Sequence, residues 1–312
     1  MTALICGSLA FDNIMVFPGR FKDHILPDKI HMLNVAFLVP ELRREFGGCA
    51  GNIAYNLKLL GGDGVPMGTV GRDFAPYAEW LHSQAIDGRF VRAYDDQFTA
   101  QAYITTDLDD NQITAFHPGA MANAHEQEVP TDAGMSIGIV SPDGKDGMGS
   151  HARQFASASI PFIFDPGQAL PQFEGPELLE MVELATWLTV NDYEMQLVSE
   201  RTGLAPKALA ERVSALVVTR GGEGSEIHSD GGITEIPAAK VSGLADPTGC
   251  GDAYRAGLLY GLMNELGWEV TGRLASLMGA VKIESHGTQN HRPDLDELGR
   301  RYRDSFGAAA PW

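Results

Sequence analysis

Runs of apolar residues of strand length alternate with amphipathic runs of helical length from residue 134 onward. Strands are predicted at residues 135–140, 161–164, 186–190 and 215–219, and helices at about 148–158, 176–184, 192–202 and 206–213. A hairpin is predicted at 225–236, where Asp230, Gly231 and Gly232 separate two short extended segments. This alternation favours an α/β fold with a doubly wound, mostly parallel central sheet flanked by helices.

Two excursions interrupt this pattern in the first half of the chain. A strand is predicted at 3–9, and helices at about 53–60 and 75–85. Residues 13–46 instead mix apolar side chains with prolines and charges, and residues 99–116 predict a β-hairpin with an Asp/Asn-rich turn. We expect a single domain over 1–312, in which insertions at about 13–46 and 95–120 form a small β-sheet lid. A dimer surface and a loop layer on the core remain alternatives for 13–46.

The bulk composition narrows the class of partner. Nucleic acids and anionic membranes require a basic face, which a net charge of −18 does not favour. The 3 cysteines contain no CxxC pair, which fits a reducing compartment and no disulfide or zinc framework. Residues 1–10 lack a basic start, and no window approaches the roughly 18 apolar residues of a membrane span. We therefore expect a cytoplasmic protein without a signal peptide.

The glycine-rich stretch at 246–259 carries the sharpest chemical signal. Gly249 and Gly251 allow close backbone approach to a ligand, and the residues from 253 onward predict a helix. The first turn of a helix offers unpaired N–H groups and the positive end of the helix dipole, which together bind anions. Asp252 lies in that turn, where a carboxylate can deprotonate a nucleophile. The alternative is a glycine loop with an aspartate cap.

Polar residues also follow the first strand and begin the first helix. Asp12 follows the run at 3–9, where ligands of open α/β sheets gather, although a solvated turn aspartate would have the same pattern. Gly47 and Gly48 precede the helix and allow close backbone approach. Asn52, on its first turn, can present its amide to a hydroxylated ligand.

Two further motifs indicate nucleotide chemistry. Asn191 and Glu194 are spaced to share a face at a helix entry and hold a hydrated Mg²⁺, although these two residues by themselves favour an Asn cap with its capping-box Glu. Residues 219–224 form a glycine turn at a strand end that can follow a phosphate chain. The P-loop, dinucleotide and nucleophile-elbow fingerprints are all missing from the sequence.

Four motifs in order resemble the ribokinase-like (PfkB-type) superfamily of sugar and nucleoside kinases. GGCAGN at 47–52, followed by Gly61 and Gly71, resembles the N-terminal signature, and DPTGCGD at 246–252 resembles the C-terminal one. NxxE at 191–194 and TxGxxG at 219–224 lie between them in the family's order. The resemblance spans residues 7–290, and residues 38–48 also resemble bacterial adenosine and nucleoside kinases.

The resemblance implies a role for each matching residue. Asp252 would be the base for the acceptor hydroxyl, beside an anion hole formed by Gly249, Cys250 and Gly251. Asn191 and Glu194 would organise Mg²⁺ and phosphate, largely through water. The ribose hydroxyls would be bound by Asp12, Gly47, Gly48 and Asn52, with Ser8 nearby. ATP would be bound by Asn191, Thr219, Gly221, Gly222 and Gly224. Gly287 and Asn290 would lie near the adenine or a K⁺ site.

Cys250 departs from the small residue that the family usually has at this position. A thiol at a helix N-terminus tends to a lowered pKa. We therefore expect Cys250 to be alkylated faster than Cys6, and ATP to protect it.

The expected activity is ATP-dependent phosphorylation of a nucleoside 5′-hydroxyl, adenosine first, with inosine, guanosine or cytidine as further acceptors. An apolar slot for the base is expected within 13–46, from Phe17, Met32, Leu33, Phe37 and Val39. A sugar kinase acting on ribose or fructose is the alternative, and a non-catalytic nucleoside or nucleotide sensor a more remote one. Beyond these small molecules, the expected partner is a second copy, in a homodimer clasped through the lid.

Overall fold

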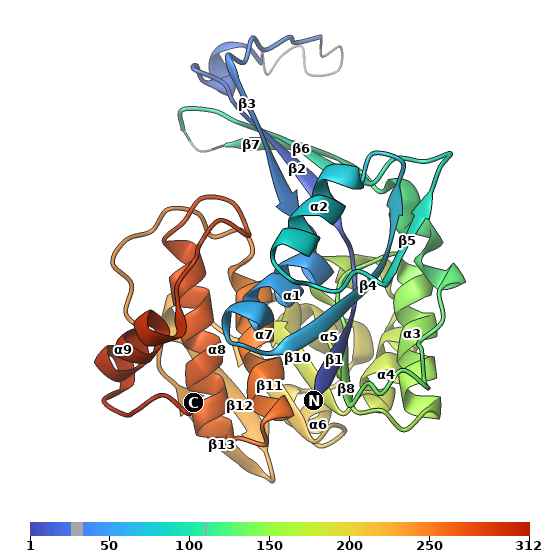
Figure 1. Cartoon of the computed structure of the whole chain (residues 1–312), viewed down its shortest axis with the longest axis vertical. Coiled ribbons are helices and arrows are strands. Elements are labelled where there is room, and N and C mark those ends of the chain that lie inside the picture. Colours follow the sequence, from blue (N-terminus) through green and yellow to red (C-terminus); the bar gives the residue numbers. More distant parts are fainter. Residues whose placement is uncertain (26–33, 110) are drawn as a thin grey trace.

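A nine-stranded sheet forms the body of the protein in the computed structural model, which describes residues 1–25, 34–109 and 111–312 (Figure 1). Its order is β13-β12-β11-β10-β9-β8-β1-β4-β5, and the pairs are parallel except β11–β12 and β12–β13, which are antiparallel. The strands are β1 (Thr2–Cys6), β4 (Asp63–Gly71), β5 (Phe90–Tyr94), β8 (Ile137–Val140), β9 (Phe162–Phe164), β10 (Trp187–Asn191), β11 (Ala215–Thr219), β12 (Ser225–Ser229) and β13 (Gly232–Ile236).

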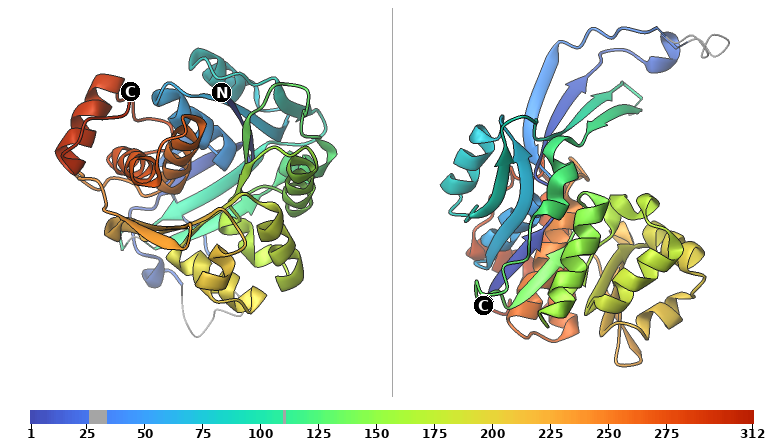
Figure 2. Two further views of the ribbon diagram at one scale, coloured as in Figure 1. Left: turned by 90° about the horizontal axis from the view of Figure 1, so that it is seen from below. Right: turned by 90° about the vertical axis from the view of Figure 1, so that its right-hand side faces the viewer.

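Helices cover both faces of this sheet because its central strands are apolar on both sides (Figure 2). Ala3 and Ile5 of β1 pack into the core beneath one helical layer, and Leu4 and Cys6 into the core beneath the other. The first layer comprises α1 (Cys49–Leu59), α2 (Ala75–Ser83), α7 (Cys250–Met263) and α8 (Trp268–Ile283), with α9 (Leu295–Phe306) packed on α8. The second comprises α3 (Lys145–Ser157), α4 (Gly175–Leu184) and α5 (Asp192–Thr202), with the short α6 (Pro206–Ala210) following.

A separate four-stranded sheet stands over one end of the body (Figure 1). Its order is β3-β2-β6-β7, formed by β2 (Ala10–Val16), β3 (Glu41–Gly47), β6 (Ala100–Thr106) and β7 (Gln112–His117). The β2–β6 pair is parallel and the two outer pairs are antiparallel. This small sheet joins the body where β1 runs into β2 through three residues, so the two sheets share one continuous stretch of chain.

The predicted α/β architecture is confirmed, and so is the small second sheet. The prediction for the start of the chain is wrong in detail, because residues 3–9 are not one strand: β1 ends at Cys6 and β2 begins at Ala10. Asp12 therefore lies within a strand of the small sheet rather than after the first body strand. Residues 41–47 also form a full strand because β3 pairs along the whole of β2, and β5 was not predicted.

No helix of the described residues has the length and apolar character that crossing a membrane requires. The cytoplasmic location stays a prediction.

Candidate active site

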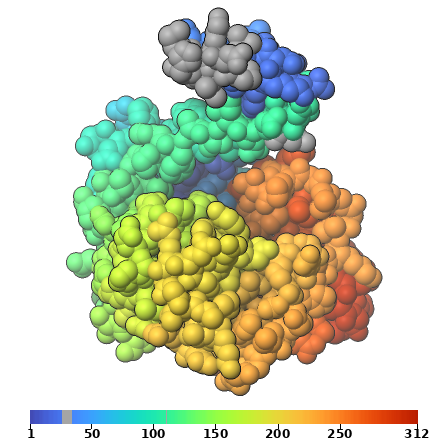
Figure 3. All heavy atoms as spheres, turned by 180° about the vertical axis from the view of Figure 1, so that it is seen from behind, coloured from blue at the N-terminus to red at the C-terminus, as the bar shows by residue number. Residues whose placement is uncertain are grey.

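The carboxyl ends of several parallel strands meet beneath the small sheet and bring polar residues together. Ser8 follows β1, Asp143 follows β8, Asp165 follows β9, and Asn191 ends β10. Because parallel strands place their carboxyl ends on one edge, residues far apart in sequence converge there. Figure 3 shows the molecule hollowed between the small sheet and the body at this edge.

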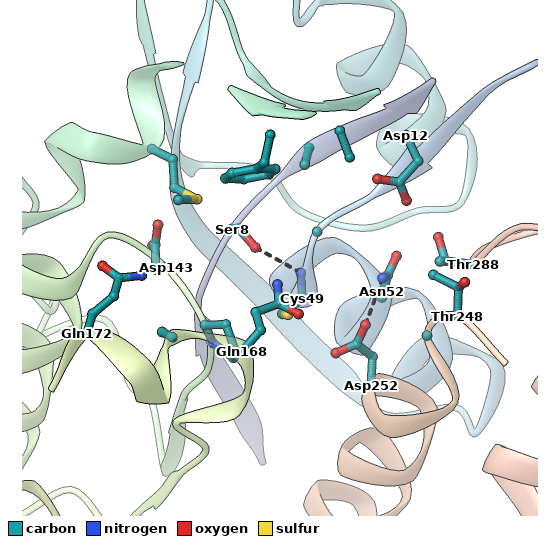
Figure 4. Close-up of a pocket in the computed structure, with 18 residues that line it drawn as sticks. Ser8, Asp12, Cys49, Asn52, Asp143, Gln168, Gln172, Thr248, Asp252 and Thr288 are labelled. Atoms are coloured by element: carbon teal, nitrogen blue, oxygen red, sulfur yellow. Dashed lines mark hydrogen bonds between the residues drawn. The ribbon is translucent and has the colours of Figure 1, made fainter. Parts of the chain in front are cut away.

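Three adjoining cavities line this edge. The acceptor cavity, of about 390 Å³, lies under the small sheet and is lined by Ser8, Asp12, Asn52 and Asp252 among others (Figure 4). The phosphate cavity, of about 480 Å³, shares Gly249 and Asp252 with it. The nucleotide cavity, of about 370 Å³, shares Thr219, Gly221 and Gly251 with the phosphate cavity. The three cavities thus form a row. Asp252 lies between the acceptor cavity and the phosphate cavity, and the nucleotide cavity at the end of the row is an apolar groove.

The N-terminus of α7 points its first N–H groups into this row. Gly249 caps the helix at φ 80°, a left-handed conformation that glycine adopts without strain. The N–H groups of Gly251 and Asp252 have no hydrogen-bond acceptor among the described residues. The Cys250 N–H instead donates to the Pro247 carbonyl at 3.2 Å. The predicted anion hole therefore needs a correction, since the backbone turn uses the Cys250 N–H and leaves the Asp252 N–H free.

Asp252 is held and its acidity tuned by its surroundings. Asn52 on α1 donates from Nδ2 to Asp252 Oδ2 at 2.8 Å, which fixes the carboxylate between the two cavities (Figure 4). Burial raises the pKa of Asp252 to about 6, although the Asn52 hydrogen bond opposes the shift. An aspartate at its ordinary pKa of about 3.9 is a weak base, so this shift suits proton abstraction near neutral pH.

A chain of buried hydrogen bonds supports Asn52 from behind. Gln289 donates from Nε2 to Asn52 Oδ1 at 3.0 Å and to the Tyr77 hydroxyl at 2.6 Å. Tyr77 in turn donates to the Gly47 carbonyl at 2.8 Å, and Trp80 donates to Gln289 Oε1 at 2.8 Å. This network connects Asn52, the hydrogen-bond partner of Asp252, to the end of β3. The sequence analysis did not predict Gln289, Tyr77 or Trp80 as part of the site.

The residues predicted for the ribose hydroxyls gather around the acceptor cavity. Gly47 lies against Asp12, because a Cβ added to Gly47 would come within 2.5 Å of Asp12 Oδ2. Gly48 has φ 85° and leaves no room for a Cβ beside the Ser8 carbonyl. Ser8 Oγ accepts from the Cys49 N–H at 3.1 Å. Burial, then the Asp246 and Glu45 carboxylates, raise the pKa of Asp12 to about 6.

The far end of the acceptor cavity is built from residues that the sequence did not single out as binding groups. Gln168 and Gln172 lie on the segment after β9, and Asp143 lies beside them (Figure 4). Asp143 is buried, and its Oδ2 has no hydrogen-bond partner among the described residues. Burial raises the pKa of Asp143 to about 7. The apolar walls are Ala10, Ala102, Phe116, Met121, Pro142 and Ala169.

The apolar residues within 13–46 that were predicted to form a slot for the base do not line the acceptor cavity, as far as the structure describes them. Phe17, Phe21 and Phe37 pack against one another beyond β2, with ring centroids 4.8–6.0 Å apart. They pack together because β2 and β3 carry them away from the body, and none of them lines the acceptor cavity. Met32 and Leu33 lie outside the described residues, and Val39 is not among the cavity's lining residues.

Asn191 and Glu194 form the capping box that was the alternative explanation for them. The Asn191 side chain accepts from the Glu194 N–H at 2.7 Å, and the Glu194 carboxylate accepts from the Asn191 N–H at 2.8 Å. Both also line the phosphate cavity with Asp165 and Asp192. No cluster of three or more metal-ligating side chains occurs among the described residues. The donor set thus fits a cation held largely through water rather than a dedicated protein cage.

The nucleotide cavity contains the predicted glycine turn. Thr219, Gly221, Gly222 and Gly224 line it, opposite apolar residues of the 238–247 segment, α7 and α8. Gly287 and Asn290 do not: the Gly287 N–H donates to Asp246 Oδ2 at 3.0 Å, and Asn290 donates to Glu45 Oε2 at 2.9 Å. These two residues link the C-terminal loop to Asp246 and β3, so neither lines the nucleotide cavity.

The thiol of Cys250 does not have the predicted acidity. Burial raises its pKa to about 11, which the nearby Lys282 only partly opposes. The helix N-terminus therefore does not determine this pKa. Cys250 still lines the nucleotide cavity and is partly exposed, whereas Cys6 and Cys49 are buried. Faster alkylation of Cys250 and its protection by ATP remain predictions, which now rest only on the exposure of this thiol in the nucleotide cavity.

A buried ammonium group lies beneath the loop that precedes α7. Lys282 of α8 is fully buried, and its Nζ donates to the carbonyls of Asp246 at 2.7 Å and Ser285 at 3.1 Å. The Asp246 side chain accepts from the Thr248 and Gly287 N–H groups. A positive charge thus joins the loop before α7 to the loop that leads to Gly287 and Asn290, the residues predicted to lie near the adenine or a K⁺ site.

The fold and this row of cavities match known proteins along nearly the whole chain. The chain belongs to the pfkB family of carbohydrate kinases, which matches residues 12–295. A nucleoside kinase of Methanocaldococcus jannaschii is 32% identical over 270 residues, which cover 86% of this chain and 89% of that protein.

Solved structures agree with this assignment. The structure of Burkholderia thailandensis nucleoside kinase in complex with inosine is 50% identical, with a TM-score of 0.90, and the match covers 98% of this chain and 99% of that one. The same protein in complex with ADP-inosine is 51% identical, with a TM-score of 0.88, over 99% of this chain and 97% of that one. The chain is thus a kinase of the nucleoside and carbohydrate class.

Proposed function

We propose that the protein transfers the γ-phosphoryl group of ATP to the 5′-hydroxyl of a purine nucleoside, with adenosine as the first expected acceptor and inosine as the second. The observation that carries the proposal is the position of Asp252 on the first turn of α7, between the acceptor and phosphate cavities. A base at that point reaches a hydroxyl on one side and faces the phosphates on the other.

The acceptor cavity supports a nucleoside rather than a free sugar. Asp12 and Asn52 occupy one end, where carboxylate and amide groups suit ribose hydroxyls. Gln168 and Gln172 lie toward the other end (Figure 4), and Phe116 and Met121 also line the cavity; together they suit the polar edge and the apolar faces of a base. A volume of about 390 Å³ leaves a free ribose with unfilled space. The relative that binds inosine supports the same reading.

The chemistry relies on positioning and charge. The transferring phosphoryl group passes through a loose transition state, so the acceptor proton leaves late and an aspartate suffices as the base. In the reaction the 5′-oxygen forms a bond to the γ-phosphorus, the bond to the ADP oxygen breaks, and Asp252 receives the proton. The free N–H groups of Gly251 and Asp252 would hold the equatorial oxygens.

A magnesium ion bound with ATP would neutralise charge on the β- and γ-phosphates. Glu194 and Asn191 would hold its water shell, and both keep their capping hydrogen bonds while doing so.

The deciding experiment is ADP release from Mg·ATP with adenosine, inosine, guanosine, cytidine, ribose and fructose in parallel. Turnover confined to nucleosides supports the proposal, and turnover confined to ribose or fructose contradicts it in favour of a sugar kinase. Inactivity on all six favours a nucleoside or nucleotide sensor.

Asp252→Asn tests the base separately. Turnover should fall by about 10²–10⁴-fold, the usual worth of a positioned base. Binding of ADP should stay close to that of the unmodified protein, because Asp252 does not line the nucleotide cavity. Retained turnover would rule out Asp252 as the base.

A further inference from the structure

A buried arginine that no motif predicted lies beneath the phosphate cavity. Arg255 is on α7, one turn after Asp252, and only 5% of its surface is exposed. Its Nε and Nη2 donate to the two carboxylate oxygens of Asp165, each at 3.0 Å, and Nη2 is 4.0 Å from Glu194 Oε2. This bidentate pair fixes the plane of the guanidinium group.

The third guanidinium nitrogen of Arg255, Nη1, takes part in no hydrogen bond among the described residues. Nη1 lies under the anion-hole turn, because a Cβ added to Gly251 would be 3.3 Å from it. Arg255 also lines the phosphate cavity. Nη1 is not among the fully buried atoms that lack a partner in the described residues, so it is accessible from the cavity, where a ligand can accept a hydrogen bond from it.

The charged residues of the phosphate cavity show why a phosphate ligand would need Arg255. Asp165, Asp192, Glu194 and Asp252 line the cavity, and Arg255 is the sole lysine or arginine among its lining residues in the described parts of the chain. Asp165 binds Arg255 through two hydrogen bonds and Glu194 lies 4.0 Å from it, so a phosphate in this cavity faces an excess of carboxylates and needs every positive group there. A guanidinium nitrogen beside the N–H groups of α7 is the one full positive charge that the lining residues offer there, within the parts of the chain that the structure describes.

We propose that Arg255 contacts the transferring phosphoryl group through Nη1 and that Asp165 orients it for this contact. The inference rests on the proposed phosphoryl transfer and adds a side-chain charge to the backbone anion hole. Arg255 keeps its protons throughout, and the acceptor proton still goes to Asp252. The charge that spreads over the equatorial oxygens in the transition state meets the guanidinium, so the contact strengthens during the reaction.

A purely structural ion pair is the competing explanation, and single substitutions do not separate the two. Removing Arg255 alone leaves Asp165 buried and unpaired, which destabilises a protein strongly. The double variant Arg255→Gln/Asp165→Asn replaces the ion pair by a neutral hydrogen-bonded pair of similar shape. Arg301→Gln/Glu284→Gln is the matched control, because that pair is also bidentate and partly buried but lines none of the three cavities.

Two measurements on the full chain then test the contact. The first is the affinity for a non-hydrolysable ATP analogue divided by that for ADP, which needs no acceptor. The second is kcat with the best nucleoside, alongside thermal unfolding. In Arg255→Gln/Asp165→Asn we expect the affinity ratio to fall by about tenfold or more and kcat by at least about 10²-fold, as for other arginines at transferring phosphoryl groups. The control variant should change neither.

Near-normal kcat and an unchanged affinity ratio in a folded double variant would overturn the inference. If the double variant does not fold, Arg255→Lys replaces it, since lysine keeps the charge but cannot bind Asp165 through two nitrogens and present a third. An unchanged ratio and kcat in that variant would equally overturn the inference. If the unmodified protein turns over no nucleoside, the proposed function fails, while the affinity ratio still tests Arg255.

Discussion

Three carboxyl groups around the acceptor cavity have raised pKa values because they are removed from water. Asp12 and Asp252 titrate at about 6, and Asp143 at about 7. Asp12 and Asp252 are placed to meet hydroxyl groups, whereas Asp143 has an unpaired oxygen at the opposite end. Each shift has a consequence that can be measured.

Activity should depend on pH through Asp252. Below its pKa of about 6 the carboxyl group is protonated and cannot accept the acceptor proton, so kcat/KM should fall by about tenfold per pH unit. Above that pKa, kcat/KM should reach a plateau. The profile is measured from pH 4.5 to 8 in the unmodified protein and in Asp12→Asn, which removes the second group titrating nearby. A profile that stays flat down to pH 4.5 would contradict the role of Asp252.

Stability should depend on pH through Asp143. Its pKa is about 7 in the folded protein and about 3.9 in the unfolded chain, so the folded state binds the proton more tightly. Its contribution to the free energy of unfolding is therefore complete below about pH 4 and is lost as the pH rises through 7.

Asp143→Asn should remove this decline. The variant should be more stable than the unmodified protein at pH 8 by about 1–3 kcal/mol, and the difference should vanish near pH 4. Urea denaturation at several pH values measures it, with the exposed Asp146→Asn as the control. Equal pH dependence in the two variants would show that Asp143 is not the group responsible.

Single residues also show the limits of prediction from sequence. Asn52 and Asp252 were predicted because they follow glycines at the start of a helix, and Asp12 because it follows the first apolar run. The structure brings all three to one cavity. Gln168, Asp143 and Arg255 were missed because polar residues after strands and on helices are common. Their positions at the carboxyl ends of β8 and β9, and one turn into α7, were the available signals.

At the scale of elements, the loop before α7 is held by α8 through Lys282. The Nζ of Lys282 already occupies the carbonyl oxygens of Asp246 and Ser285. A monovalent cation binds to oxygens of this kind, and the buried ammonium would repel it. We therefore predict that no K⁺ is needed for turnover.

Replacing K⁺ by Na⁺ or by tetramethylammonium at constant ionic strength should leave kcat unchanged. The control is Mg²⁺ omission, which should abolish turnover in all three salts. A strong and selective activation by K⁺ would contradict the role given to Lys282.

The regular elements of the body were predicted more accurately than the small sheet. The α/β segments after residue 134 matched because each strand and helix has its own local periodicity. The small sheet depends instead on the parallel pairing of β2 with β6, which joins Ala10 to Ala100. No local pattern reports a pairing between segments so far apart. The Gln289–Asn52 hydrogen bond, between residues 237 positions apart, was out of reach for the same reason.

At the scale of the whole molecule, the face of the small sheet turned away from the acceptor cavity carries exposed apolar residues. Leu42, Tyr103 and Ile113 are 64%, 43% and 45% exposed, and the strand registers place them on this one face. Exposed apolar groups of this kind mark interaction surfaces. We predict a homodimer formed through this face.

Light scattering should give about twice the chain mass of 33.6 kDa. Ile113→Asp should shift the equilibrium to monomer, whereas Ile233→Asp, on the distant β13 hairpin, should not. A monomer in the unmodified protein, at every concentration measured, would contradict the prediction.

The shared walls of the three cavities have a consequence for inhibitor design. Because the acceptor cavity opens into the phosphate cavity and the phosphate cavity into the nucleotide cavity, a single unbranched molecule can occupy all of them. Two nucleosides joined through their 5′-oxygens by a polyphosphate chain have the required shape. The number of phosphates in the compound that binds most tightly would then measure, in solution, the distance between the base-binding end of the acceptor cavity and that of the nucleotide cavity.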